Sequence, residues 1–338
     1  MSRDLTVALV GATGIVGGEF LRLMEERAFP VKELRLLATK RSAGRQLSFR
    51  GEKLTVQETT HDAFDGADVA FISASTAASK ELCPVARDRG AIVFDDSSAW
   101  RMDPDVPLVV PELNGEDLRD HHGIIATPNC STVPLVLTLQ PLMRARQIVR
   151  VVADTYQSVS GAGTAPMAEL RAQTAAVLAG EPVQVEHAPK QIAFNAIPQV
   201  DVFLESGYTN EELKMTNETR KILHLPDLPV STTCVRIPTL ISHAVAVHVE
   251  LDAPIDPAEA RALWSEQAGV TVIDDPVNGG YPTPLDSVAR DDVFVGRARQ
   301  DSSHPNGLVY WCVTDNLVKG AALNVLQMAE CMQADGIL

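Results

Sequence analysis

The stretch LTVALVGATGIVG, residues 5–17, decides the fold. Its first part is largely apolar, as in a buried strand, and its glycine-rich part leads into a segment with Phe20, Leu23 and Met24 at helical spacing. A glycine-rich turn between a first strand and a first helix is typical of dinucleotide-binding folds, because glycine lets the backbone approach a pyrophosphate at the helix N-terminus. The spacing is GxxGxxG, a variant of GxGxxG, and a turn without a ligand is the alternative.

Strands and helices continue to alternate after this turn. Apolar runs predict strands at residues 34–39, 69–73, 91–95 and 123–126, and helical spacing predicts a helix at 79–89. Alternation of this length predicts an N-terminal Rossmann-type fold of the α/β class, with a doubly wound parallel sheet.

The turn after the second predicted strand, TKRSAGR at residues 39–45, bears on the cofactor. An enzyme that uses NAD is expected to place an acidic residue here to bind the ribose hydroxyls. The turn instead carries Lys40, Arg41 and Arg45 with the hydroxyl of Ser42, a set that suits a 2′-phosphate. We therefore predict NADP, with a solvated basic turn as the alternative.

A second informative turn is TPNCSTV, residues 127–133, between the strand at 123–126 and an apolar helical run at 133–139. Near a helix N-terminus, backbone N–H groups and the helix dipole lower the pKa of a thiol and can receive a developing oxyanion. Cys130 is therefore a candidate nucleophile. The alternative is a structural thiol, because a lone cysteine is more often a small buried hydrophobe.

The rest of the chain predicts an α+β domain. We expect strands at 148–156, 231–238, 243–251 and 308–314, and helices at 167–179, 209–221 and 322–334. The last of these helices is expected to pack back on the first domain.

Three polar features stand out in this second part. Thr209 or Asn210 can cap the helix that follows. Glu211 and Lys214 share one face of that helix, which by itself indicates a surface ion pair. His243 and His248 are five residues apart and face opposite sides of a strand, so a shared metal is not expected and at most one of them faces a site.

Composition narrows the class of protein. The chain has 338 residues, 45% of them hydrophobic, and a net charge of −15, which argues against a nucleic acid or an anionic membrane as partner. We see no apolar run of roughly 18 residues and no signal-peptide pattern at the N-terminus. The cysteines are scattered and contain no CxxC pair, so we expect neither a metal site nor disulfides, and a cytoplasmic location. They are Cys83, Cys130, Cys234, Cys312 and Cys331.

The ordered motifs of the chain resemble those of the aspartate-β-semialdehyde dehydrogenases. They are GATGIVG, TKRSAG, SSAWRMDPDVPLVVPELN, PNCST, YQSVSGAG, FNAIPQVD, EELKMTNETRKIL, RIPTLISHAVAVHVEL and DNLVKGAA. One departure is small: Thr39 stands where many members carry serine, and it keeps the hydroxyl. The resemblance implies NADP-dependent, reversible, phosphorylating oxidation of L-aspartate-4-semialdehyde to L-aspartyl-4-phosphate, with phosphate as co-substrate. It also implies a homodimer and a place in the biosynthesis of lysine, threonine, methionine, isoleucine and diaminopimelate.

The resemblance also implies roles for residues. Cys130 resembles the nucleophile that forms a thiohemiacetal and then a thioester, His243 the acid/base that titrates near neutrality, and Gln157 the orienting amide. The implied substrate contacts are Arg236 for the α-carboxylate, Glu211 for the α-amino group, and Arg101, Asn129 and Lys214 for the phosphate. Glu212 remains an alternative to Glu211. The implied cofactor contacts are Thr13, Gly14, Ile15, Val16, Arg41, Ser42, Ser160, Gly161 and Asn316.

The implied domains are an NADP-binding domain, 1–129 with 317–338, and a catalytic and dimerisation domain, 130–316. Two other functional interpretations of the sequence remain. An N-acetyl-γ-glutamyl-phosphate reductase shares the Cys/His pair, but an acetylated amino group needs no acidic partner such as Glu211. A non-catalytic paralogue would be expected to lose the thiol or the base, and both are present.

Overall fold

The computed structural model describes residues 3–338, which form two compact units. The first contains the described residues up to Pro128 together with Ala321–Leu338, and the second contains Asn129–Gly320. The C-terminal segment thus joins the first unit, as expected for the last helix. The assignment of an NADP-binding role and a catalytic role to two domains stays a prediction.

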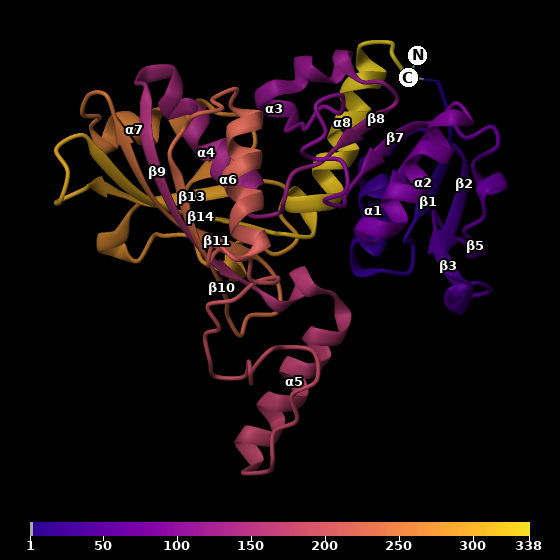
Figure 1. Ribbon diagram of the computed structural model, residues 1–338, viewed down its shortest axis with the longest axis horizontal. Helices are drawn as coiled ribbons and strands as arrows, with labels where there is room; N and C mark the ends of the chain where they lie inside the picture. Colours follow the sequence, from indigo (N-terminus) through magenta and orange to yellow (C-terminus); the bar gives the residue numbers. More distant parts are fainter. Residues whose placement is uncertain (1–2) are drawn as a thin grey trace. The chain divides into compact units, whose positions relative to one another are not determined.

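The first unit is built on a six-stranded parallel sheet with the strand order β5-β2-β1-β6-β7-β8 (Figure 1). The chain moves outward from β1 on one side and then returns to β6 on the other, so the order reverses beside β1. This topology confirms the predicted Rossmann-type sheet. The strands are β1 (Leu5–Val10), β2 (Val31–Ala38), β5 (Gln57–Glu58), β6 (Val69–Ile72), β7 (Ile92–Asp95) and β8 (Ile124–Ala126).

The helices of this unit cover the sheet, and aromatic rings fix one of them. The ring of Phe20 on α1 stacks on Phe71 of β6 with centroids 5.2 Å apart, and Phe94 of β7 lies 5.6 Å from Phe71. Such pairs add about 0.5–1.5 kcal/mol each beyond area burial. The helical segments are α1 (Ile15–Glu26), η1 (Lys40–Ser42), η2 (His61–Phe64), α2 (Thr76–Asp88), α3 (Pro111–Asn114), η3 (Gly115–Asp120) and α8 (Leu323–Ala334).

A small hairpin that the sequence does not predict follows the basic turn. Its strands are β3 (Gln46–Phe49) and β4 (Glu52–Thr55), paired antiparallel. Most of its residues are exposed or half-buried, so the apolar alternation that marks a strand is weak there.

The second unit is built on a six-stranded mixed sheet with the order β10-β9-β11-β14-β13-β12. The β10/β9 and β12/β13 pairs are parallel and the other pairs are antiparallel. This sheet and its helices confirm the predicted α+β domain. The strands are β9 (Ile148–Gln157), β10 (Val230–Arg236), β11 (His243–Leu251), β12 (Val270–Val272), β13 (Val293–Gln300) and β14 (Gly307–Thr314).

The buried helix α4 packs on this sheet, and Trp264 of α7 anchors it. The indole N–H of Trp264 donates to the Thr138 carbonyl at 2.8 Å, and its ring lies 4.9 Å from that of Tyr310. The helical segments are α4 (Thr132–Ala145), η4 (Val159–Ala162), α5 (Thr164–Ala179), α6 (Asn210–Ile222), α7 (Pro257–Glu266), η5 (Pro276–Asn278) and η6 (Pro284–Ser287). The π-helical turn η7 (Val318–Ala322) begins in this unit, and its last two residues belong to the first unit. The sequence predicts no element in residues 252–307, where α7, β12 and β13 lie.

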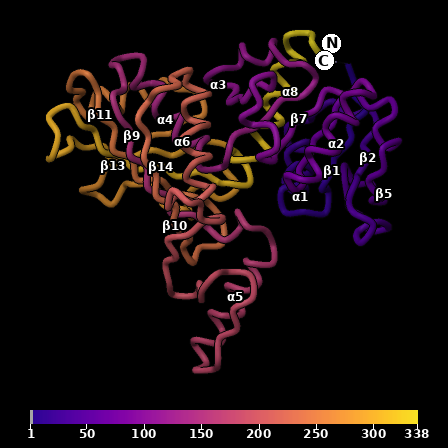
Figure 2. Tube along the Cα trace, viewed as in Figure 1, coloured from indigo at the N-terminus to yellow at the C-terminus, as the bar shows by residue number. Residues whose placement is uncertain are grey.

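Helix α5 runs away from the sheet of its unit, and the following loop returns beside it (Figures 1 and 2). Two buried side chains of α5 hold the loop. The Glu169 carboxylate accepts the backbone N–H groups of residues 186, 187 and 188, and the Gln173 amide oxygen accepts those of residues 192 and 193. These bonds replace the secondary structure that the loop lacks. No helix in residues 3–338 is long and apolar enough to cross a membrane.

Candidate active site

Cys130 is half-buried in the turn that enters α4, where Ser131 is the N-cap. The neighbouring N–H groups are already bonded: that of Asn129 donates to Glu218 Oε2 at 2.6 Å, and that of Ser131 donates to Asn129 Oδ1 at 2.9 Å. The N–H groups of Thr132 and Val133 donate to the Asn129 carbonyl. The expectation that such N–H groups receive an oxyanion is therefore wrong for these four, because Asn129 and Glu218 occupy them.

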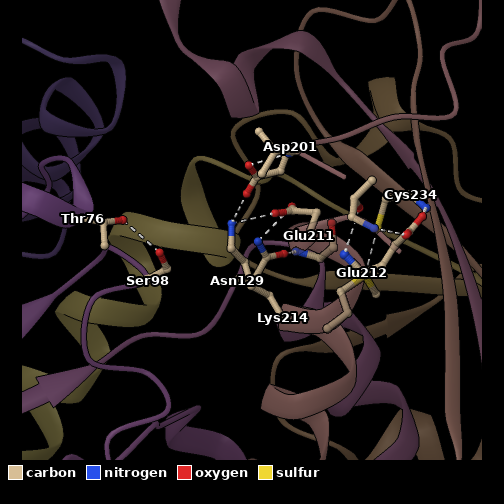
Figure 3. Close-up of polar contacts among 12 residues, drawn as sticks. Thr76, Ser98, Asn129, Asp201, Glu211, Glu212, Lys214 and Cys234 are labelled. Carbon is tan, nitrogen blue, oxygen red and sulfur yellow. Dashed lines mark hydrogen bonds and ion pairs between the residues drawn. The ribbon is translucent and has the colours of Figure 1, made fainter. Parts of the chain in front are cut away.

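Helix α6 presents acidic residues toward this turn. Glu211 Oε1 accepts the Asn129 side-chain amide at 2.9 Å (Figure 3). Glu218 lies two turns further along the helix. Glu212 has a different function. Its carboxylate accepts the backbone N–H groups of Thr209 at 2.6 Å and Cys234 at 3.0 Å, which completes a capping box. Thr209, rather than Asn210, is thus the N-cap. The carboxylate of Glu212 stabilises the start of α6 and its contact with β10.

Glu211 is a buried, charged group. Burial raises its pKa, but the charge of Lys214 and the hydrogen bonds from Asn129 and Gln157 outweigh that effect, so its pKa lies below the usual value. Lys214 Nζ lies 3.3 Å from Glu211 and 2.7 Å from Asp201 (Figure 3). The predicted ion pair therefore exists, but the prediction of a surface pair is wrong because Glu211 is only 6% exposed.

Three side chains come from adjacent strands at one end of the mixed sheet. The register pairs Gln157, the last residue of β9, with both His243 of β11 and Arg236 of β10. The Gln157 Nε2 donates to Ser131 Oγ at 2.6 Å and to Glu211 Oε1 at 3.2 Å. Gln157 thereby connects the strand ends to the cysteine turn and to α6.

His243 is fully buried. Its Nδ1 accepts the backbone N–H of Ser158 at 3.1 Å, and its Nε2 has no hydrogen-bond partner among residues 3–338. Burial, and then the charge of Arg236, lower its pKa to about 3. This pKa lies below that of an ordinary histidine, which titrates near neutrality, and the acid/base role of His243 stays a prediction. His248 is exposed, which confirms that the two histidines face opposite sides of β11.

Arg236 is the cation of this cluster. Its Nη1 donates to the Ser158 carbonyl at 2.6 Å. Burial lowers the pKa of Arg236, while Glu211 and Cys130 are close enough to raise it. A cavity of about 350 Å³ opens beside Arg236, between η4, α5 and residues 187–201.

Two glycines pack against the cluster. A Cβ at Gly161 would lie 3.1 Å from His243 Nε2 and 3.2 Å from Arg236 Nη1. A Cβ at Gly320, in the π-helical turn, would lie 2.9 Å from the Cys130 Cβ. Ser160 and Asn316 lie behind His243: Asn316 Oδ1 accepts the Ser160 hydroxyl at 3.0 Å and the Ser242 N–H at 2.9 Å.

Sequence reasoning missed four residues of this site: Ser131, Ser158, Glu218 and Gly320. None carries a local signal, because each acts through a contact with a segment distant in sequence. The π-helical turn around Gly320 has no sequence pattern that distinguishes it from the helix after it.

In the first unit, the strand ends form an edge suited to a dinucleotide. Gly11 has φ of +83°, and a Cβ there would lie 1.9 Å from the Ser73 carbonyl oxygen, so only glycine fits. Helix α1 begins at Ile15 without a side-chain cap, which leaves its first turn able to bind a pyrophosphate. The hydroxyls of Thr76 and Ser98, which follow β6 and β7, lie 3.0 Å apart (Figure 3).

The other predicted residues of the first unit also lie after strands of its sheet. Arg41 is exposed and Ser42 half-buried in η1, directly after β2, and Thr13 to Val16 form the entry to α1. Arg101 is 7% exposed, and its Nη2 donates to the Asp96 carbonyl at 3.3 Å. The roles of these residues, and of those in the second unit, stay predictions.

The remaining cysteines differ from Cys130. Burial raises the pKa of Cys83, Cys234 and Cys312, that of Cys312 to about 12, as expected of structural thiols. Cys331 is exposed on α8. None of the five forms a disulfide in the described part of the chain.

Comparisons with known proteins agree with this architecture. The family model "Semialdehyde dehydrogenase, NAD binding domain" matches residues 6–121, and "Semialdehyde dehydrogenase, dimerisation domain" matches residues 139–319. The chain is 49% identical to the aspartate-semialdehyde dehydrogenase of Bacillus subtilis, over 98% of this chain and 99% of that protein. A solved structure of aspartate semialdehyde dehydrogenase II from Vibrio cholerae, complexed with ASA, superposes with a TM-score of 0.96 at 43% identity, over 99% of both chains.

Sequence and structure therefore agree with these relatives over nearly the whole chain. The chain belongs to the aspartate-semialdehyde dehydrogenase family and is an oxidoreductase of amino-acid biosynthesis, with that family's NAD-binding and dimerisation domains.

Proposed function

We propose that the chain catalyses the NADP-dependent, reversible, phosphorylating oxidation of L-aspartate-4-semialdehyde to L-aspartyl-4-phosphate, and that the biosynthetic direction is the reduction. One observation carries the proposal. A half-buried thiol stands near a half-buried guanidinium and a buried carboxylate, and the side-chain amides of Asn129 and Gln157 donate hydrogen bonds to that carboxylate. The Vibrio cholerae relative, whose structure contains ASA, supports the substrate.

Arg236 and Glu211 suit the two charged ends of an α-amino acid. The guanidinium of Arg236 would bind the α-carboxylate, and the carboxylate of Glu211 would bind the α-ammonium group. We assign the second role to Glu211 rather than Glu212, because the carboxylate of Glu212 accepts the backbone N–H groups of Thr209 and Cys234. A buried, ionised Glu211 also favours a substrate with an ammonium group over its N-acetylated analogue.

Cys130 supplies covalent catalysis. In the oxidative direction its thiolate attacks the aldehyde and forms a thiohemiacetal, and after oxidation the acyl group is held as a thioester that phosphate cleaves. The bound nicotinamide would supply the hydride acceptor for the oxidation. Gln157 orients the acyl group from the strand end, and Asn129, Lys214 and Arg101 are the residues we assign to the phosphate.

The first unit supports binding of NADP. Gly11 allows a close turn, the uncapped first turn of α1 can hold the pyrophosphate, and Lys40 and Arg41 lie exposed after β2, where a 2′-phosphate would be bound. We assign this role to residues 1–129 with 317–338, with Ser160, Gly161 and Asn316 as further cofactor contacts from the catalytic domain, 130–316.

We also propose a homodimer in the cytoplasm. The family's dimerisation domain covers residues 139–319, and the sheet of this unit carries half-exposed aromatic side chains, with the rings of Tyr156 and Trp311 5.2 Å apart. All five cysteines are free thiols, which is typical of proteins in a reducing compartment.

The decisive test is reduction of NADP by aspartate semialdehyde, followed by absorbance with and without phosphate. We expect turnover that depends on phosphate and on Cys130, and no comparable turnover of N-acetylglutamate semialdehyde. A Cys130→Ala variant that kept the wild-type rate would contradict the mechanism. Turnover of the acetylated substrate alone would assign the chain to the other reductases instead.

A further inference from the structure

Glu218 is a buried acidic residue to which the proposed mechanism gives no role. It is 1% exposed on α6, and its Oε2 accepts the backbone N–H of Asn129 at 2.6 Å, from a residue 89 positions away in the chain. A buried backbone N–H is destabilising unless it has an acceptor, and Glu218 supplies one. The residue after Asn129 is Cys130, so this hydrogen bond is made one residue from the candidate nucleophile.

The side chain of Asn129 is held as closely as its backbone. Its Oδ1 accepts the N–H of Ser131 at 2.9 Å, and its Nδ2 donates to Glu211 Oε1 at 2.9 Å (Figure 3). Glu211 and Glu218 are both buried and lie about two turns apart on α6, so they share one face of the helix. The same helix therefore holds Asn129 at two points, one on the side chain and one on the backbone.

The other neighbour of Cys130 is held by a different element. Ser131 Oγ accepts the Nε2 of Gln157, the last residue of β9, at 2.6 Å. Cys130 thus lies between a residue fixed by α6 and a residue fixed by the mixed sheet. A nucleophile reacts fast only when it is held about 3–3.5 Å from the carbon that it attacks and in line with it, so the orientation of this short turn controls the rate.

Helix α6 is fastened to its surroundings independently of Glu218. The hydroxyl of Thr232 on β10 donates to the Glu212 carbonyl at 3.0 Å, near the start of the helix. Towards its end, Arg220 Nε donates to the Leu228 carbonyl at 2.8 Å, just before β10. Loss of the bond from Glu218 should therefore release the cysteine turn and leave the helix in place.

We propose that Glu218 is a positioning residue for the nucleophile: it accepts the Asn129 N–H and thereby fixes the turn that aims Cys130 at the substrate carbonyl. The proposal rests on the function given above, because it concerns the orientation of the same thiol. Its physical basis is the reach of a hydrogen-bond acceptor. An uncharged acceptor at the same reach should therefore replace Glu218, and an acidic group with a shorter reach should not.

Two conservative variants separate reach from charge. Glu218→Gln keeps the length of the side chain and an oxygen that accepts an N–H, and it removes the acidic group. Glu218→Asp keeps the acidic group and withdraws it by one methylene. Since a displacement of about 1 Å can cost about 10²-fold in rate, we expect kcat of Glu218→Asp to be at least about tenfold below that of Glu218→Gln. The KM for aspartate semialdehyde should change less, because Arg236 and Glu211 remain to bind it.

Hydrogen exchange of the Asn129 amide tests the contact in the resting enzyme. Mass spectrometry of fragmented peptides from the turn follows this amide without turnover. We expect exchange at least about tenfold faster in Glu218→Asp than in the wild type, and exchange close to that of the wild type in Glu218→Gln. Glu212→Asp is the matched control, because it shortens a buried acceptor of backbone N–H groups on the same helix that does not contact Asn129. Equal acceleration in Glu212→Asp would show general loosening of α6 and overturn the proposal.

The two measurements separate this proposal from the proposed function. A wild-type protein that did not turn over aspartate semialdehyde would contradict the proposed function, and hydrogen exchange would still test the contact made by Glu218. If the wild type turned over and Glu218→Asp was as fast as Glu218→Gln or faster, the acidic group rather than its reach would matter. That result would overturn the positioning role alone.

Discussion

The two units build their sites from different parts of the chain. In the first unit the edge suited to the cofactor is largely backbone: a turn at Gly11 with positive φ and the uncapped first turn of α1. In the second unit, side chains from distant segments surround the Cys130 turn, including Glu211, Gln157 and Glu218. A backbone site depends on a few contiguous residues, whereas a side-chain site depends on the register and packing of a whole domain.

The largest effect that we expect tests the backbone site. Gly11→Ala places a Cβ 1.9 Å from the Ser73 carbonyl oxygen at a φ of +83°. Strain at such a position costs about 1–3 kcal/mol before the clash is counted. We expect a loss of several kcal/mol in the free energy of unfolding, measured by urea denaturation, together with loss of cofactor binding.

Gly18→Ala is the matched control, because Gly18 lies on α1 with no neighbour within 4 Å of a built Cβ. It should stabilise the protein by about 0.5–1 kcal/mol through helix propensity. If the two variants had equal stability, the close approach at Gly11 would not be required by the fold.

The corresponding test in the second unit is Gly320→Ala. Its Cβ would press on Cys130, 2.9 Å from the Cβ and 3.2 Å from the Cα of that residue. Displacement of a nucleophile by about 1 Å costs about 10²-fold in rate, so we expect kcat to fall by that order with little change in KM. Gly115→Ala, where no neighbour lies within 4 Å, is the control. Wild-type kinetics in Gly320→Ala would show that the turn tolerates repacking.

The buried His243 gives the second unit a pH-dependent stability. Its pKa is about 3 in the folded protein and about 6.5 in the unfolded chain, so only the unfolded chain binds the proton between these values. Stability should therefore fall on acidification through this window, by up to roughly 1.4 kcal/mol per pH unit. Urea denaturation at a series of pH values gives the free energy of unfolding as a function of pH. We expect its slope to be smaller in His243→Gln than in the wild type. Identical slopes would mean that His243 has the same pKa in the folded and unfolded states.

The smallest effect concerns the basic turn. Arg41 is exposed in η1, so its contact with a 2′-phosphate would be partly screened. We expect Arg41→Ala to reduce the ratio of kcat/KM for NADPH over NADH by about tenfold, which corresponds to about 1.4 kcal/mol. The rate with NADH should not change, and the exposed Lys53 on the nearby hairpin provides a control in Lys53→Ala. An unchanged ratio would argue that other groups select the cofactor.

Several elements of the site were predictable because their signals are local. The cysteine turn, the histidine on β11 and the acidic start of α6 lie where the patterns place them, and the two histidines face opposite sides as the strand period requires. The choice between Glu211 and Glu212 was open in the sequence. The structure favours Glu211, because the carboxylate of Glu212 accepts the backbone N–H of Cys234, 22 residues away, and the substrate contact itself stays a prediction.

The sequence by itself therefore determined the alternation of strands and helices, the glycine turn, the cysteine turn and the family resemblance. Each of these signals lies within a short run of consecutive residues. Only the tertiary structure decided that Glu218 occupies the Asn129 N–H, that Gly320 packs on Cys130, and that the Ser158 N–H faces Nδ1 of His243. These contacts join residues up to 190 positions apart, counted as 320 minus 130. Hydrogen bonds and close packing depend on the distance between atoms in space, which no local pattern of residues encodes.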